Sequence, residues 1–262
     1  MQISNRDLER FREIIYRHTG ISLNRHKNYL LSAKLQKIMM RLHYEDLDSF
    51  YKLLESENRE SLDNLINYVT TNHTFFFREK SHLDILVNNI NRRGLKNINI
   101  WCAASSSGEE AYSIAIYLLE NRIKDFLIIA SDIKREVLIH MKKGIYQKYK
   151  LNRTPPLYIQ KYFRKIKLDN AYQYKISPAV KKHVRAKKIN LIRDMQFYRP
   201  FDYIFCRNVM IYFDTPTTQK VVAHLLNNLH KNGLLFIGHS ENLFNITGRA
   251  VPAGPAVYKK KE

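Results

Sequence analysis

Apolar residues at helical spacing dominate the first third of the chain. Leu8, Phe11 and Ile14 share one helical face, and Ser4 and Asp7 before them have the spacing of a capping box. This pattern is typical of an amphipathic helix that packs against other helices. Stretches with the same period predict further helices over 26–43, 46–56, 61–70 and 80–91.

From about residue 97 onward the period changes, and short apolar runs alternate with helical stretches such as 109–120. This alternation favours an α/β fold with a mostly parallel sheet covered on both faces. In such sheets ligands bind at the carboxyl ends of the strands. The predicted strands are 97–103, 126–130, 201–206, 234–237 and 256–258.

One segment, 146–188, does not follow this alternation. It is rich in tyrosine, has no glycine, and carries Pro155 and Pro156 near its start. Polar and apolar residues alternate over 172–176, as in an edge or hairpin strand. We therefore predict a small inserted β-subdomain here.

Composition indicates a folded protein with a strong positive charge. Of 262 residues, 45% are apolar and 26% charged, and 44 Lys and Arg against 24 Asp and Glu leave +20. No stretch approaches the roughly 18 apolar residues of a membrane span, and the amino terminus lacks a signal peptide. Two cysteines do not form a disulfide framework, which favours a reducing cytosol. The charge favours an acidic partner, either nucleic acid or an acidic protein surface.

Small residues follow the first predicted strand, from Ala103 to Glu110, and let the backbone approach a ligand. A single glycine disfavours pyrophosphate and suits a cofactor with an adenosine and an amino acid. Glu109 could contact that cofactor or complete a capping box with Ser106. Asp132, 24 residues beyond Gly108, could accept hydrogen bonds from ribose hydroxyls or cap the next helix.

Polar residues also follow two later strands. Arg207 and Asn208 lie between apolar runs and must reach partners or a cleft. Cys206 is best explained as a small core residue. The segment from His239 to Glu241 could serve acid–base chemistry or form a polar loop. No arrangement of residues predicts a metal site.

Several segments, in order along the chain, form one pattern. They are TTNHTFFFRE at 70–79, WCAASSSGEEAYSIA at 101–115, ASDI at 130–133, GIY at 144–146, FCRNVMIYFD at 205–214, GHSENL at 238–243 and GPAVYKK at 254–260. In these segments the chain resembles the chemotaxis receptor methyltransferases, the CheR-type enzymes, along nearly its whole length. The first two resemble that family's TN-x-T-x-FFRE and W-x-A-x-x-S-x-GEE-x-YSIA motifs.

The resemblance implies an all-helical domain joined to a Rossmann-like methyltransferase domain with an inserted antiparallel β-subdomain. The implied cofactor is S-adenosyl-L-methionine (SAM), which leaves as S-adenosyl-L-homocysteine. The predicted units are a helical domain over 1–78, a linker helix over 79–96, the methyltransferase domain over 97–262 and the inserted β-subdomain over 146–188. The cofactor-binding residues implied by motif position are Asn72, Thr74, Arg78, Glu109, Asp132, Asn190, Leu191, Arg207 and Asn208.

By the same resemblance, the reaction methylates glutamate side chains of chemoreceptors, giving methyl esters. A glutamate carboxylate is already ionised at neutral pH, so no general base is needed. Attack on the sulfonium methyl cancels a negative and a positive charge, and the enzyme mainly supplies proximity and orientation. Arg78 suits orientation of the carboxylate, and Tyr212 is expected beside the methyl group. A nucleic-acid methyltransferase, suggested by the charge, and a non-catalytic SAM-binding scaffold are the alternatives.

A basic stripe on the second predicted helix could dock the acidic methylation helices of a receptor. It consists of Lys27, Lys34, Lys37 and Arg41, although a solvated helix face would have the same pattern. Relatives that tether to a receptor's C-terminal peptide carry glycines in a β-subdomain loop, and none occurs here between Gly144 and Gly233. We therefore expect no tight peptide tether. We further expect a monomeric cytoplasmic protein recruited to membrane receptor arrays without inserting into the membrane, and no nucleic-acid partner.

Overall fold

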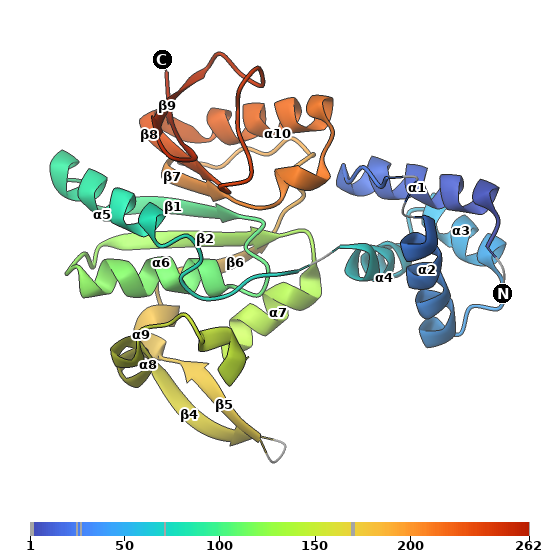
Figure 1. Ribbon diagram of the computed structural model, residues 1–262, viewed down its shortest axis with the longest axis horizontal. Helices are drawn as coiled ribbons and strands as arrows, with labels where there is room; N and C mark the ends of the chain where they lie inside the picture. Colours follow the sequence, from blue (N-terminus) through green and yellow to red (C-terminus); the bar gives the residue numbers. More distant parts are fainter. Residues whose placement is uncertain (1–2, 25, 27, 71, 169–170, 262) are drawn as a thin grey trace.

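A computed structural model describes residues 3–24, 26, 28–70, 72–168 and 171–261. Figure 1 shows two bodies side by side, the helical N-terminal domain in blue and the sheet-based domain in green to red, with a small sheet projecting from the latter. The α/β fold with a separate helical domain, expected from the changing hydrophobic period, is confirmed.

Four helices form the N-terminal domain. They are α1 (Asn5–Thr19), α2 (Asn28–Leu42), α3 (Leu47–Glu55) and α4 (Arg59–Val69). The predicted capping box begins α1, where the Ser4 side chain accepts from the Asp7 amide and the Asp7 side chain contacts the Ser4 amide. Leu8, Phe11 and Ile14 are buried in one cluster with apolar residues of the other helices, as the helical period predicted.

The linker helix belongs to the larger domain by its packing. This helix, α5 (Ser81–Arg93), buries Leu83 and Leu86 in the core of the sheet domain. Phe76 and Phe77 are buried in the same core, and only Phe75 remains partly exposed. The three phenylalanines therefore have different surroundings. Three consecutive side chains point in different directions and cannot all pack against one surface. By its packing, the sheet domain includes Phe76 and Phe77, which the prediction placed in the helical domain ending at residue 78.

Seven strands form the main sheet, in the order β6-β2-β1-β7-β8-β10-β9. The first five are parallel, and β10 runs antiparallel to both of its neighbours. The strands are β1 (Ile98–Ala103), β2 (Phe126–Asp132), β6 (Val184–Lys188), β7 (Phe201–Cys206), β8 (Leu229–Ile237), β9 (Ala250–Gly254) and β10 (Val257–Lys260). β6 and β9 were not predicted from the sequence.

Helices cover both faces of this sheet. α6 (Glu109–Glu120) and α7 (Arg135–Lys143) pack with α5 on one face, and α10 (Thr215–Asn227) packs on the other. Cys206 is fully buried, and burial raises the pKa of its thiol, in agreement with a core role. The chain runs from β1 outward to β6 and then returns to β7 on the other side of β1. Such a reversal opens a crevice at the carboxyl ends of the two central strands.

The predicted insertion is a three-stranded antiparallel sheet in the order β3-β5-β4. It contains β3 (Ile145–Gln147), a 3-10 helix (Lys148–Leu151), α8 (Pro156–Tyr162), β4 (Phe163–Leu168), β5 (Ala171–Ile176) and α9 (Pro178–Lys181). β6 pairs in parallel with β2, so the last residues of the predicted 146–188 range belong to the main sheet.

Polar contacts join the helical domain to the strand ends. The Ser22 amide donates to the Tyr212 carbonyl (2.8 Å), and the Lys134 ammonium donates to the Asn67 carbonyl (2.8 Å). The Lys188 ammonium pairs with Asp63 at 2.6 Å. These contacts place the helical domain over the crevice. Within the described ranges, no helix has the length and apolarity needed to cross a bilayer.

Candidate active site

A cavity of about 220 Å³ lies where the helical domain meets the carboxyl ends of the strands. One wall, called here the strand-end wall, consists of the loops after β1, β2, β6 and β7. The other, called the helical wall, consists of Thr19, Ile21, Leu23, Lys34, Val69 and Thr70. The connecting segment 72–78 lines the cavity between the two walls. The site is therefore built from residues far apart in the sequence.

Nearly all of the residues predicted to form the site line this cavity. They are Asn72, Thr74, Arg78, Asp132, Asn190, Leu191, Arg207, Asn208 and Tyr212. The structure brings them together from the connecting segment and from the ends of β2, β6 and β7. Asn190 has a second task, because its amide nitrogen donates to the His18 carbonyl at 2.7 Å and so links the two domains.

Glu109 is the exception, and its neighbour Glu110 lines the cavity in its place. The Glu109 side chain is fully buried, accepts from the Ser107 hydroxyl at 2.6 Å, and lies 3.1 Å from the Lys150 ammonium. The predicted capping box with Ser106 is also wrong, because α6 begins at Glu109 itself and Gly108 is its N-cap. Direct contact between Glu109 and a ligand in this cavity therefore has no support in the geometry.

Gly108 explains why the loop after β1 turns so sharply. Its φ of 93° is the left-handed region that favours glycine. A Cβ at this position would lie 2.1 Å from Cγ of Met141 on α7. The small residue thus permits close packing of α6, and the next residue, Glu110, is carried to the cavity.

Asp132 ends β2 with its carboxylate held by two backbone amides. One oxygen accepts from the Ser106 amide at 2.9 Å and the other from the Lys134 amide at 3.0 Å. Burial raises the pKa of this carboxyl, and the hydrogen bonds from the two backbone amides lower it by a smaller amount. α7 begins at Arg135 without a side-chain cap, so Asp132 does not cap it in the predicted sense. Each carboxylate oxygen has a further lone pair with which to accept from a ligand hydroxyl.

Arg207 forms the charged centre of the strand-end wall. Its guanidinium side chain is 3% exposed and bridges Glu79 and Glu110, each at 2.9 Å. It also donates to the Arg78 carbonyl at 2.8 Å. Burial raises the pKa of Glu110, and the charge of Arg207 opposes that rise. Arg207 therefore joins the connecting segment, α6 and the end of β7 in one ionic network.

Glu241 is an organising residue whose role the sequence left open. One carboxylate oxygen accepts from the amides of Val209 (3.0 Å) and Met210 (2.8 Å). The other accepts from the amides of Asn208 (2.9 Å) and Gly238 (2.6 Å). The carboxylate thus holds the loop that follows β7. Glu241 follows Gly238 by three residues, at the end of an apolar strand, which marks it as a candidate loop residue. The sequence does not show which backbone amides its carboxylate reaches.

Arg78 and Tyr212 border the open part of the site. The Arg78 guanidinium donates to the His73 carbonyl at 3.1 Å and lies 5.7 Å from the centre of the Phe75 ring. Tyr212 is 37% exposed, and its backbone is held by the contact with Ser22. Both side chains line the cavity while remaining partly accessible, which suits groups that meet a second substrate.

Two lysines line the cavity next to the helical domain. The Lys34 ammonium donates to the Val69 carbonyl at 2.7 Å, and that of Lys134 donates to the Asn67 carbonyl. Burial lowers the pKa of both side chains. Lys34 therefore lies at the cavity, separate from the exposed Lys37 and Arg41 with which it was grouped. Lys27 lies outside the described residues.

Two buried hydroxyls in the loop after β1 lack partners among the described residues. They belong to Ser105 and Ser106, which line the cavity and are 2% and 9% exposed. Buried polar atoms are normally hydrogen-bonded, so unpartnered hydroxyls beside a cavity point to a ligand with polar groups. Together with Asp132, they fit a small molecule that carries both hydroxyl and charged groups.

Known proteins match this chain in sequence along nearly its whole length. Residues 6–70 match the family described as "CheR methyltransferase, all-alpha domain", and residues 72–254 match "CheR methyltransferase, SAM binding domain". The chain is 35% identical over 263 residues to the chemotaxis protein methyltransferase of Escherichia coli (strain K12), covering 98% of this chain and 92% of that relative.

Two further relatives come from distant bacteria. Identity is 34% over 275 residues with the chemotaxis protein methyltransferase of Borreliella burgdorferi, with 99% of this chain and 96% of the relative covered. It is 35% over 260 residues with chemotaxis protein methyltransferase 2 of Pseudomonas aeruginosa, with coverage of 96% and 92%. The match includes both domains and the cavity between them. This chain therefore belongs to the CheR methyltransferases and is a SAM-dependent enzyme.

Proposed function

We propose that the protein transfers a methyl group from SAM to glutamate side chains of chemotaxis receptors. The observation that carries this proposal is the cavity at the strand ends, where Arg78 and Tyr212 border the partly open side. An arginine in that position matches an anionic acceptor, because a guanidinium binds carboxylates by charge-assisted hydrogen bonds. The names of the relatives, chemotaxis protein methyltransferases, support the choice of receptor.

The residues of the strand-end wall fit SAM. Asp132 would accept from the ribose hydroxyls, and the hydroxyls of Ser105 and Ser106 would contact polar groups of the cofactor. Glu110, in place of Glu109, would face the amino-acid part, with Arg207 holding its carboxylate in position at 2.9 Å. SAM supplies a methyl group on a positively charged sulfur when bound.

Arg78 would orient the acceptor glutamate without serving as a base. A guanidinium has five N–H donors, and the hydrogen bond to the His73 carbonyl uses one. The acceptor carboxylate is already ionised at neutral pH, so reaction needs alignment and exclusion of water. If Arg78 paired too tightly with the acceptor carboxylate, it would stabilise the bound substrate more than the transition state. An orienting contact at the edge of the cavity therefore suits the reaction better than a buried ion pair.

A methylation assay tests this proposal directly. The protein is incubated with methyl-labelled SAM and either receptor cytoplasmic fragments or nucleic acid. We expect a base-labile ester on the receptor fragment. Label on nucleic acid would favour the alternative enzyme, and SAM binding without transfer would favour a scaffold.

Variants at the cavity edge test the assigned roles. Arg78→Ala should lower kcat by about 100-fold, as for loss of one positioning contact. SAM affinity should change less than kcat. Arg78→Lys is the matched variant, because it keeps the charge without the planar fork and should recover only part of the rate. Full activity of Arg78→Ala would reject the orienting role.

Receptor docking would use the exposed face of α2. Lys37 and Arg41 are exposed there, and the neighbouring Met40 is 72% exposed. Charge attraction with apolar contact suits an acidic helical bundle. Lys34 is not part of this surface, because its ammonium donates inside the cavity.

A double charge reversal, Lys37→Glu with Arg41→Glu, should raise KM for receptor at low salt while leaving kcat nearly unchanged. The matched control is reversal of Arg122 and Lys124, which are exposed in the turn before β2, at the amino ends of the parallel strands and so away from the cavity. Equal effects of the two reversals would show that net charge alone matters. We further propose that no tight receptor-tail tether exists, and a peptide titration with micromolar affinity would overturn this.

A further inference from the structure

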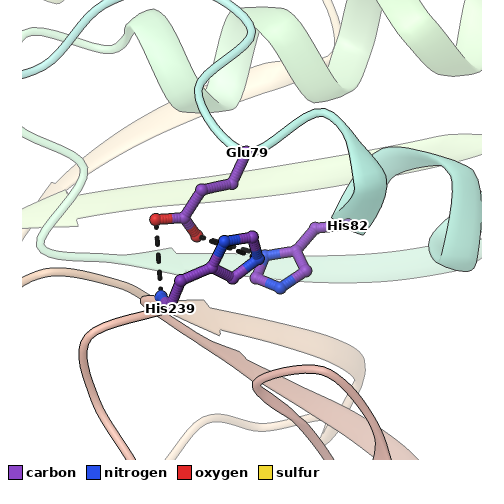
Figure 2. A group of neighbouring side chains, drawn as sticks. All are labelled: Glu79, His82 and His239. Atoms are coloured by element: carbon purple, nitrogen blue, oxygen red, sulfur yellow. Dashed lines mark hydrogen bonds and ion pairs between the residues drawn. The ribbon is translucent and has the colours of Figure 1, made fainter.

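A carboxylate and two imidazoles converge behind the ionic network of Arg207. They belong to Glu79, His82 at the start of α5 and His239 after β8, and one potential ligand atom from each residue lies within 4.8 Å of the other two. Figure 2 shows the three side chains pointing toward one another from these separate elements. The cluster is distinct from the substrate cavity, because none of its three residues lines that cavity.

His82 presents an unpartnered lone pair to this cluster. The ring is fully buried, and its Nε2 lies 3.1 Å from the Pro255 carbonyl oxygen, so Nε2 carries the proton and Nδ1 is an acceptor. Nδ1 is buried and has no hydrogen-bond partner among the described residues. It lies 3.6 Å from Oε2 of Glu79, which is also an acceptor. Two acceptors facing each other at this distance require a bridging proton donor or a cation.

The separation of these two atoms suits a bridging metal ion as well as a bridging water. A water about 2.8 Å from both atoms would subtend about 80°, so each of its hydrogen bonds would deviate only about 12° from linear. A zinc ion about 2.1 Å from both would subtend about 120°, close to the tetrahedral angle. Nε2 of His239 lies 3.9 Å from the same oxygen and would complete a set of three ligands. The three ligand atoms lie within 4.8 Å of one another, so His239 must move closer to the other two ligands on binding. Its side chain is 47% exposed, which permits this movement and leaves a solvent-accessible fourth position.

The charges around the cluster are balanced before any ion binds. Glu79 and Glu110 share Arg207, and the Arg78 guanidinium lies 4.0 Å from Oε1 of Glu79. Arg207 donates to the Oε2 atom of Glu79, and a carboxylate oxygen has a second lone pair with which to bind a metal. An arginine on a metal-binding carboxylate would act as an outer hydrogen-bond partner that fixes the ligand orientation.

We propose that Glu79, His82 and His239 form a binding site for a divalent transition-metal ion of the Zn²⁺ class. Two imidazoles and a carboxylate with an open fourth position is a recurrent zinc ligand set. The ion would connect the start of α5 to the loop after β8, the same loop that holds Asn208 through Glu241. Its effect is therefore on the stability of the strand-end wall, and the proposal does not depend on the methyl acceptor.

Metal binding by the tag-free, chelator-treated full-length protein tests the site. Zn²⁺ is titrated in competition with a chromophoric chelator, and Co²⁺ is added as a spectroscopic probe. We expect one equivalent of bound metal and the visible bands of a tetrahedral Co²⁺ complex. At 100-fold excess over its dissociation constant, Zn²⁺ should raise the unfolding midpoint by about 5 °C, reversibly on addition of chelator.

Two histidine variants separate this site from adventitious binding. His239→Ala removes an exposed ligand without disturbing the core and should weaken binding by at least about tenfold. His140→Ala removes an exposed histidine on α7 and should bind as the unmodified protein does. His82→Gln should also lose the Co²⁺ bands. The proposal is overturned if the unmodified protein binds no stoichiometric metal, or if His239→Ala and His140→Ala bind equally.

Discussion

The two walls of the cavity are built in different ways. In the strand-end wall, charged groups meet opposite charges or backbone amides, as Arg207 does with Glu79 and Asp132 with Ser106. In the helical wall, the Lys34 ammonium donates to a carbonyl of its own domain. Contacts between the two domains include partly exposed polar pairs such as Lys188 with Asp63. The strand-end wall is thus part of the folded core, whereas the helical wall is placed by a domain interface.

This difference suggests a division of labour. Groups that must hold SAM and align the reaction need fixed geometry, which the ends of a buried parallel sheet provide. The domain interface controls how the acceptor reaches the cavity. Changes in the strand-end wall should therefore affect folding and chemistry together, while changes in the helical wall should be milder. The following predictions, from the largest expected effect to the smallest, test that contrast.

Arg207→Met should be the most damaging change. It leaves two carboxylates, with side chains only 13% and 15% exposed, without their shared cation. Breaking a buried ion pair typically costs about 3–5 kcal/mol. The free energy of unfolding, measured with urea, should fall by about that amount, and activity should be lost. A loss below 1 kcal/mol would mean that solvent reaches Glu79 and Glu110, and that the strand-end wall is not the rigid element described here.

The folding stability should also depend on pH through His82, which lies behind the strand-end wall. Burial lowers its pKa to about 4, with a further contribution from the charge of Arg207. Below about pH 6.5 the unfolded chain binds a proton at this histidine that the folded protein does not, so folding stability falls as pH falls. The loss is complete near pH 4 and amounts to about 3 kcal/mol. Nothing is lost above about pH 7.

The comparison is made in metal-free buffer between the unmodified protein and His82→Gln. Urea unfolding at several pH values should show a shallower decline for the variant between pH 6.5 and 4. Parallel declines would show that the pKa of His82 is the same in the folded and unfolded protein, so that burial does not lower it.

Asp132→Asn should weaken SAM binding with a smaller effect on folding. A hydrogen bond to a charged acceptor contributes about 1.5–3 kcal/mol, so the dissociation constant should rise by about 10- to 100-fold. Calorimetric titration with S-adenosyl-L-homocysteine measures this change. Glu136→Gln on the exposed part of α7 is a matched control and should bind normally. Unchanged affinity of Asp132→Asn would remove this carboxylate from the cofactor site.

Lys34→Met should have the smallest effect. It removes one hydrogen bond from the half-buried Lys34 ammonium to the Val69 carbonyl. Burial of this ammonium has a desolvation cost that offsets part of the hydrogen bond's stabilisation. The expected loss of stability is about 1 kcal/mol. Its effect on receptor methylation should not depend on salt, unlike that of the Lys37 and Arg41 reversal. A strong salt-dependent defect would return Lys34 to the docking surface.

Local patterns predicted most of the fold. The helical period located α1 to α5, and apolar runs located the central strands, because both signals depend only on which residues face a core. β6 was not predicted as a strand of the main sheet, because Val184–Lys188 is mostly charged and has few apolar residues for a buried strand. It lies at the sheet edge, where one neighbour and exposed side chains suffice.

The site was predicted less evenly. Motif position identified the loops after β1, β2 and β7, and these loops do line the cavity. It selected Glu109, whereas Glu110 lines the cavity. Adjacent residues at a helix start point in directions about 100° apart, and only packing shows which one lines the cavity. The helical spacing of basic residues grouped Lys34 with Lys37, although α4 lies against one side of α2 and its Val69 carbonyl accepts from the Lys34 ammonium.

The sequence by itself determined the fold class, the order of the elements and the family, because these follow from periodicity and from motifs read along the chain. Only the tertiary structure decided which charged groups are buried together. The network of Arg207 with Glu79 and Glu110, the clamp of Glu241 on the loop after β7 and the convergence of His82 with His239 join residues remote in sequence. Desolvation gives these contacts their strength, and desolvation depends on the packed arrangement of the whole domain.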